Sequence, residues 1–224
     1  SVFRGGLRSS FFDYKEKNIN KKSPIKLLFV GCDAVGKGLL PCIQSIDKII
    51  KNGINVQLTI VSRMLDKQSY ILKEYAPKIS DIYKLIENKK YIRFFKGLPN
   101  QHVRELMHES DLLLFPSYDE SLGYVIIEAG LEGTPSVANN IFAIPELIQS
   151  RETGFLINQQ LGSQNRWIGI WQNNEELKCA VDKANFNIIN SLCEILSEVS
   201  LDRDILVKMG MSMRRKMETM YNME

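Results

Sequence analysis

The sequence predicts an α/β fold: a doubly wound, mostly parallel, Rossmann-like sheet followed by extra C-terminal helices. Short apolar segments alternate with longer amphipathic ones, which is typical of strand–helix units. The apolar segments are almost continuously hydrophobic, as expected for strands buried on both faces. With 224 residues, 44% of them hydrophobic and 25% charged, the chain has enough apolar material for a large core.

Six segments have the length and branched apolar composition of buried strands. They are residues 25–30, 56–61, 91–95, 111–115, 134–138 and 154–157. The segments that favour helix are 38–52, 66–76 together with 81–89, 101–109, 123–132 and 143–150. Because the two kinds of segment alternate throughout, we expect a parallel sheet covered by helices.

The chain after residue 173 has only helical character. Leu192, Ile195, Leu196 and Val199 recur at helical spacing, and a second helix is expected at about 203–221. Six of the eight methionines lie in or beside this last helix. We interpret them as adaptable core packing, with a contact surface for another domain as the alternative.

The predicted domain organisation has three parts. Residues 1–23 form an interdomain linker, 24–200 form the Rossmann-like domain, and 201–224 form a C-terminal helix. Residues 159–173 are an inserted polar loop with both tryptophans, Trp167 and Trp171. We expect this loop to pack onto the domain, the alternative being aromatic stacking against an acceptor. Because the chain does not begin with Met, we interpret it as a fragment.

Composition excludes several functions. A net charge of +3 without a basic stripe argues against nucleic-acid binding. The four cysteines form no C-x-x-C pair, which predicts reduced thiols, no zinc site and a cytoplasmic location. His102 and His108 are six residues apart on one predicted helix and are interpreted as surface residues. We interpret the basic residues 21–22 and 214–216 as solvated faces. The alternative is a weak peripheral contact with the inner face of an anionic membrane.

Polar residues follow the predicted strands, where parallel sheets bind ligands. These segments are GCDAVGKG (31–38), Ser62–Arg63, Lys96–Leu98, PSYDESLG (116–123) and Asn139–Asn140. Their glycines, hydroxyls and basic residues predict a ligand that carries phosphate. The first segment has the spacing of a P-loop, but Gly38 replaces the magnesium-binding hydroxyl, so an NTPase is disfavoured.

The segment PSYDESLGYVIIEAG (116–130) carries the most information. A helix that opens near Gly123 presents free backbone N–H groups to an anion. Glu128 lies among apolar residues on that helix, and a pair of sugar hydroxyls is a suitable partner for its carboxylate. Glu120 precedes the helix, so the two acids are badly placed to face each other across one bond as in a glycosidase.

The segment ESLGYVIIE (120–128) resembles the Glu-x7-Glu motif of retaining, nucleotide-sugar-dependent glycosyltransferases of family 4. Further parts of that family's pattern follow in order: VG…KG (30–38), a strand ending at Gly97, DLLLFPS (111–117), EAGLEGTPSVA (128–138) and PELIQSRETGFLI (145–157). The resemblance covers roughly residues 24–158.

This resemblance implies the donor-binding half of a two-domain GT-B fold, with a separate N-terminal domain that holds the acceptor. It implies a nucleotide-sugar donor, retention of configuration, and no metal or other cofactor. Lys37 and Glu120 are the implied catalytic residues, binding diphosphate and sugar, and Glu128 holds the ribose. Of the remaining implied donor contacts, the backbone around Gly123 and Tyr124 binds phosphate, and Gly97 and Leu98 lie beside the base. Gly36 and Ser117 complete the implied donor-binding set.

The sequence departs from the family pattern at the phosphate loop. Cys32 stands where the family has an arginine, Ser62 and Arg63 replace a Gly-rich turn, and Ser121–Leu122 replaces Gly-Phe. We hypothesise that Arg63 supplies the missing guanidinium, which suits phosphate oxygens. The alternative function is a catalytically inactive GT-B-like domain with a scaffold role.

Overall fold

The computed structural model describes residues 17, 23–64, 72 and 75–221. Its six strands form one parallel sheet in the order β3-β2-β1-β4-β5-β6. The strands are β1 (Ile25–Val30), β2 (Val56–Val61), β3 (Ile92–Phe95), β4 (Leu112–Phe115), β5 (Ser136–Asn139) and β6 (Gly154–Ile157). This order is that of a doubly wound Rossmann-like sheet, and it confirms the predicted fold class.

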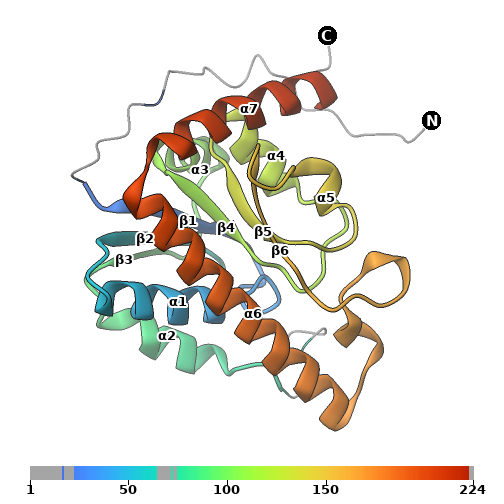
Figure 1. Ribbon diagram of the computed structural model, residues 1–224. Coiled ribbons are helices and arrows are strands. Elements are labelled where there is room, and N and C mark those ends of the chain that lie inside the picture. Colours follow the sequence, from blue (N-terminus) through green and yellow to red (C-terminus); the bar gives the residue numbers. More distant parts are fainter. Residues whose placement is uncertain (1–16, 18–22, 65–71, 73–74, 222–224) are drawn as a thin grey trace.

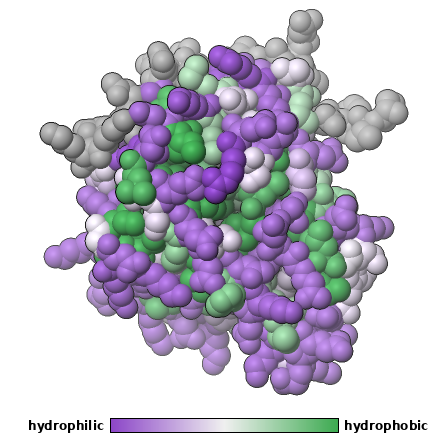
Figure 2. Space-filling model, viewed as in Figure 1, coloured by the Kyte–Doolittle hydropathy of each residue, from purple (hydrophilic) through white to green (hydrophobic). Residues whose placement is uncertain are grey.

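Helices cover both faces of the sheet. They are α1 (Leu39–Lys51), α2 (Ile79–Glu87), α3 (Asn100–Glu109), α4 (Tyr124–Leu131), α5 (Ile144–Leu147), α6 (Asn174–Leu201) and α7 (Asp204–Tyr221). Figure 1 shows α1, α2 and α6 on one face, and α3, α4, α5 and α7 on the other. On the side seen in Figure 2, hydrophilic residues surround smaller apolar areas.

Most predicted elements occur where the sequence places them, with small differences at their ends. The predicted strand 134–138 is shifted to Ser136–Asn139, and the predicted helix 143–150 already ends at Leu147. The helix stops because Ile148 has extended backbone angles (φ −110, ψ 122). The predicted helix 66–76 lies mostly outside the described residues, and α2 begins only at Ile79.

The core lies between the sheet and both helix layers. Every residue of β4 is buried, because this central strand is covered on both faces. Among the described helices, none combines the length and apolarity that crossing a bilayer requires. Between β6 and α6, the predicted loop 159–173 forms two short 3₁₀ turns, Ser163–Asn165 and Ile168–Trp171.

Three methionines of α7 are packing residues. Met209, Met213 and Met217 are buried, and α7 packs on α4. The contact is close: a Cβ added at Gly130 of α4 would lie 2.7 Å from Met217 Cγ. This confirms the interpretation of these three residues as core packing. Met211 is 37% exposed and does not belong to that core.

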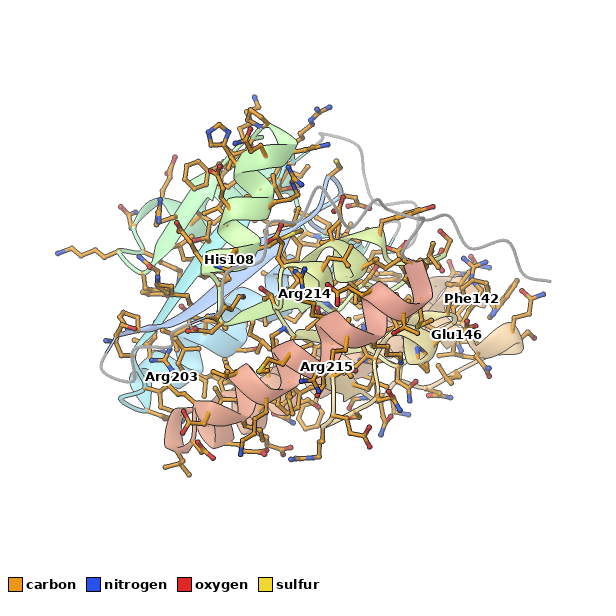
Figure 3. The ribbon with its side chains drawn as sticks, turned by 90° about the horizontal axis from the view of Figure 1, so that it is seen from above. His108, Phe142, Glu146, Arg203, Arg214 and Arg215 are labelled. Atoms are coloured by element: carbon orange, nitrogen blue, oxygen red, sulfur yellow. The ribbon has the colours of Figure 1, made fainter. Side chains whose placement is uncertain are left out.

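The basic run 214–216 is not uniformly solvated. Arg214 Nη1 donates to the Leu131 carbonyl, and Arg214 Nη2 lies 2.8 Å from Glu218 Oε1. Arg215 is exposed. Both arginines are labelled on α7 in Figure 3. The prediction of a solvated basic face is therefore wrong for Arg214, whose guanidinium ties α7 to the end of α4.

A buried ion pair joins the C-terminal helices to the start of the sheet. Arg203, between α6 and α7, places Nη2 2.6 Å from Asp111 Oδ2. The same carboxylate oxygen accepts the backbone N–H of Lys26 at 2.8 Å, and Arg203 Nη1 donates to the Ser23 carbonyl at 2.7 Å. Arg203 and Asp111 are only 4% and 8% exposed, so each charge depends on its partners.

We therefore expect Asp111→Asn to lower the free energy of unfolding by about 3 kcal/mol, because it removes the Asp111 charge from its buried contact with the Arg203 guanidinium. Urea unfolding measures this loss. Asp81→Asn is the control, since Asp81 pairs with Lys84 at 3.4 Å with both side chains mostly exposed, and its loss should stay below about 1 kcal/mol. Equal losses in the two variants would contradict the expectation.

Candidate functional site

A cavity of about 610 Å³ opens at the carboxyl ends of the first four strands. It lies at the point where the strand order reverses between β1 and β4, the position at which open α/β sheets bind ligands. Its wall is formed by Val30, Gly31, Cys32, Asp33, Lys37, Val61, Ser62, Arg63, Gly97, Leu98, Asn100, Val103, Phe115, Glu120, Tyr124, Val125 and Glu128.

The structure brings most of the predicted site residues to this cavity. Seven of them line it: Lys37, Arg63, Gly97, Leu98, Glu120, Tyr124 and Glu128. The other three, Gly36, Ser117 and Gly123, are buried next to it without forming its wall. The set converges because segments distant in sequence end at the same edge of a parallel sheet.

Gly123 is a glycine for a reason that sequence reasoning missed. Its φ of +80 lies in the left-handed region, which favours glycine at the residue before α4. An added Cβ would lie 3.0 Å from Ile144 Cδ1 and 3.2 Å from Ile126 Cδ1. The missing side chain thus gives room to the apolar core.

Gly38 explains why the P-loop hydroxyl is absent. It has a φ of +79, and an added Cβ would lie 2.4 Å from the carbonyl oxygen of Pro116. No side chain fits at this position while the loop after β1 touches the loop after β4. The two loops that carry Lys37 and Glu120 are consequently in direct backbone contact.

Asp33 shapes the turn that presents Lys37. Its Oδ1 accepts the Gly36 N–H at 2.8 Å, and its backbone carbonyl accepts the Lys37 N–H at 3.0 Å. Sequence reasoning did not assign Asp33, although an aspartate three residues before a glycine is a signal for such a turn.

Lys37 and Glu120 contact each other directly. Lys37 Nζ lies 2.6 Å from Glu120 Oε2, and the second carboxylate oxygen accepts the Ser121 N–H at 3.0 Å. The Lys37 ammonium also lies 5.3 Å from the centre of the Phe115 ring. The side chains are 24% and 15% exposed. A cation suited to an anion and a carboxylate suited to hydroxyls therefore meet at one point of the cavity wall.

Glu128 is a half-buried carboxylate on the wall. Burial raises its pKa, and the charge of Arg104 partly opposes this rise. Tyr124, one turn earlier on α4, is 52% exposed. Glu128 thus combines a desolvated acid with an open cavity, the setting in which a ligand's hydroxyl groups can replace lost water.

The phosphate-loop side of the cavity is open. Cys32 is exposed on the wall. Arg63 is also exposed, and its Cγ lies 3.9 Å from the position of an added Cβ at Gly97. The Arg63 side chain therefore begins at the rim, beside Gly97 in the segment that follows β3. Asn100 and Val103 of α3, which also line the cavity, were missed because nothing in a short amphipathic helix marks which face meets a ligand.

The 159–173 loop folds onto the domain, as expected for Trp167. This side chain is 1% exposed, and its ring lies 5.2 Å from that of Tyr118, centre to centre. Trp171 is 53% exposed. His102 is exposed, but His108 is only partly so: its Nδ1 lies 3.8 Å from Glu132 Oε2 between α3 and α4. The surface interpretation is thus wrong for His108, which Figure 3 labels on α3.

No group of three or more histidine, cysteine, aspartate or glutamate side chains suited to a metal ion occurs among the residues that the structure describes. The predicted absence of a cofactor stays a prediction.

The family described as Glycosyl transferases group 1 matches residues 10–185 of the chain. The chain belongs to this family. This group 1 chain is 30% identical over 142 residues to an uncharacterized 41.2 kDa protein in the cps region of Klebsiella pneumoniae, covering 63% of the chain and 35% of that protein. It is 26% identical over 154 residues to a glycogen synthase of Mycobacterium tuberculosis, covering 69% and 35%. The chain thus spans about a third of the length of these relatives.

Solved structures show the same fold. The C-terminal domain of a group 1 family protein (LpcC) from Francisella tularensis matches with a TM-score of 0.67 and 16% identity, covering 98% of this chain and 100% of that one. Sucrose-phosphate synthase from Thermosynechococcus elongatus matches with a TM-score of 0.67 and 18% identity, covering 97% and 47%. Anabaena Alr3699/HepE, in complex with UDP-glucose, matches with a TM-score of 0.63 and 16% identity, covering 90% and 46%.

The raised pKa of Glu128 predicts a pH-dependent stability difference. The folded state binds this proton more tightly than the unfolded state, so wild-type stability falls as the pH rises from below 4.5 through the raised folded pKa. Glu128→Gln removes that loss. We expect the variant to be more stable than the wild type at about pH 7 and to lose this advantage at about pH 4.

Urea unfolding at both pH values measures the difference. Glu87→Gln, at an exposed position of α2, is the control and should show no such crossover. A Glu128→Gln variant that is less stable than the wild type at about pH 7 would overturn the expectation.

Proposed function

We propose that the chain is the donor-binding half of a retaining glycosyltransferase that takes a sugar from a nucleoside diphosphate. The Lys37–Glu120 pair, in a cavity at the strand-order reversal, is the observation that carries this proposal. Lys37 is a cation suited to the diphosphate, and Glu120 is a carboxylate that can accept hydrogen bonds from sugar hydroxyls. The two side chains meet where the diphosphate and the sugar of such a donor are joined.

The cavity has room and chemistry for the whole donor. Its volume of about 610 Å³ falls in the range of small-molecule sites. Lys37 and the backbone N–H groups at the start of α4 face the diphosphate. Glu128 accepts two ribose hydroxyls, and Gly97 and Leu98 lie beside the base. The raised pKa of Glu128 supports this role, because hydroxyl donors stabilise a desolvated carboxylate.

The proposed chemistry is electrostatic. The bond between the anomeric carbon and the diphosphate oxygen breaks, the carbon bonds to an acceptor hydroxyl oxygen, and the hydroxyl proton passes to the departing diphosphate. Lys37, the N–H groups of α4 and Arg63 stabilise the departing diphosphate. Glu120 orients the sugar through its hydroxyls. Retention of configuration belongs to the proposal and rests on the resemblance of the Glu-x7-Glu segment.

The partners follow from the same proposal. The acceptor is a glycan or a lipid-linked sugar held by an N-terminal domain, and the site works in the cytoplasm at the inner face of the membrane. The relatives support a sugar-transfer role, since glycogen synthase is among them and HepE was solved with UDP-glucose. A scaffold domain that has lost donor binding is the second candidate, favoured by Cys32 in place of the family's arginine.

Titration of the chain with UDP, GDP and ADP tests the proposal. We expect amide resonances near Lys37, Gly97 and Glu128 to shift with one preferred nucleotide. Lys37→Ala should weaken that binding about 10- to 100-fold, the effect of losing a charge-assisted hydrogen bond.

Lys89→Ala is the matched control. Lys89 forms an ion pair of the same 2.6 Å length with Asp47, with similar exposure, but lines no part of the cavity. Its loss should leave nucleotide affinity unchanged. Absence of binding by the wild type at millimolar nucleotide would favour the scaffold role instead.

Arg63→Ala should weaken binding of the preferred nucleoside diphosphate about tenfold, because Arg63 replaces the guanidinium that the family carries at the position of Cys32. The dissociation constant measures this. Arg93→Ala removes an exposed arginine from the neighbouring β3, outside the cavity, and serves as control. An unchanged dissociation constant for Arg63→Ala would refute the substitution hypothesis.

A further inference from the structure

Two acids stand side by side before α4, and the structure separates them. Glu120 meets Lys37 in the cavity wall. Asp119 instead faces Arg166 of the 159–173 loop: Arg166 Nε donates to Asp119 Oδ1 at 3.0 Å, and Nη2 donates to Oδ2. This two-pronged contact neutralises a carboxylate that is only 9% exposed. Asp119 thereby has a structural partner, whereas Glu120 lines the cavity.

Arg166 itself is held in place on several sides. Its guanidinium lies 5.8 Å from the centre of the Phe142 ring. Its backbone carbonyl accepts the Gly162 N–H at 2.8 Å, and the Asn165 carbonyl accepts the Phe142 N–H at 2.7 Å. The next residue, Trp167, is buried against Tyr118. The arginine is therefore preorganised by the loop, which reduces the entropy lost on pairing with Asp119.

A second tie joins the same two segments. Asn139 Nδ2 donates to the carbonyls of Pro116 and Ser117 at 3.1 and 2.9 Å. The Asn139 Oδ1 accepts Gln159 Nε2, at the start of the 159–173 loop, at 2.9 Å. The 159–173 loop thus holds the segment before Glu120 directly through Arg166 and indirectly through the Gln159–Asn139 contact.

The Asp119 backbone transmits this constraint to the cavity. Its carbonyl accepts the Ser117 hydroxyl at 2.5 Å and Lys37 Nζ at 3.4 Å. Asp119, whose side chain pairs with Arg166, therefore contacts Lys37 through its backbone carbonyl and precedes Glu120 in the chain. A displacement of Asp119 displaces Glu120 with it.

The geometry points to Arg166 as a positioning residue for Glu120, so that the 159–173 loop controls how the site holds the transferred sugar. This inference rests on the proposed function and adds a residue that lies outside the cavity wall. Because Glu120 contacts the sugar and Lys37 contacts the diphosphate, loss of Arg166 affects binding of a nucleotide sugar more than binding of the nucleoside diphosphate alone.

The test compares two ligands on the same variants. The wild-type chain, Arg166→Ala and Arg166→Lys are titrated with the preferred nucleoside diphosphate and with its glucose conjugate. We expect Arg166→Ala to weaken binding of the conjugate about tenfold, the effect of roughly one charge-assisted hydrogen bond, and to weaken binding of the free diphosphate less. Arg166→Lys keeps the charge but cannot donate two parallel hydrogen bonds to Asp119, so it should recover part of the lost affinity for the conjugate.

Two further variants isolate the mechanism. In a Glu120→Gln background, Arg166→Ala should add no further loss, because the arginine acts through Glu120. Arg151→Ala is the matched control: it removes another two-pronged pair, with Glu198 at 2.7 and 3.1 Å, away from the cavity. Thermal melting and Trp167 fluorescence check that each variant is folded; if Arg166→Ala is not, Arg166→Lys carries the comparison.

Each outcome decides one question. Equal weakening for both ligands, no weakening for either, or a full additional loss in the Glu120→Gln background would overturn the role of Arg166. A wild-type chain that binds none of the nucleoside diphosphates would overturn the proposed function itself, and the inference with it.

Discussion

Parallel pairing of the strands is the constraint on which the candidate site depends. In a parallel sheet the carboxyl ends of all strands lie at one edge, so loops distant in sequence meet there. Because β4 pairs directly with β1, the loop after β4 lies against the loop after β1. The would-be side chain of Gly38 then points at the carbonyl of Pro116, and only glycine permits this approach. Lys37 and Glu120, 83 residues apart, meet as a result.

The C-terminal helices pack on the helices at both faces of the sheet. α6 packs on α1 and α7 packs on α4. These two partners are the helices that begin directly after the loops carrying Lys37 and Glu120. Arg203 joins α6 and α7 to the opposite edge of the sheet through Asp111. Among the described residues, those of α6 and α7 line no part of the cavity wall, yet they pack against the two helices that follow these loops.

Local patterns were sufficient to predict the fold and much of the site. Buried parallel strands are continuously apolar, and Lys37, Glu120 and Glu128 stand where a strand ends or a helix begins, so their neighbourhood follows from topology. Pairwise contacts do not follow in this way. Nothing local distinguishes Asp119 from Glu120, and their separate partners depend on the path of an irregular loop. The reason for Gly123 was also hidden, since it depends on core packing against Ile144 from a later helix.

The Lys37–Glu120 contact has a consequence for the order of events in the proposed reaction. In the proposed reaction an incoming diphosphate competes with Glu120 for the Lys37 ammonium, and the donor's sugar offers hydroxyls to the Glu120 carboxylate. After transfer, the spent nucleotide keeps Lys37 but leaves Glu120 without hydroxyls. Re-forming the original 2.6 Å pair then favours release of the leaving group. In the proposed reaction, the same two side chains therefore bind the nucleotide sugar and later favour release of the nucleoside diphosphate.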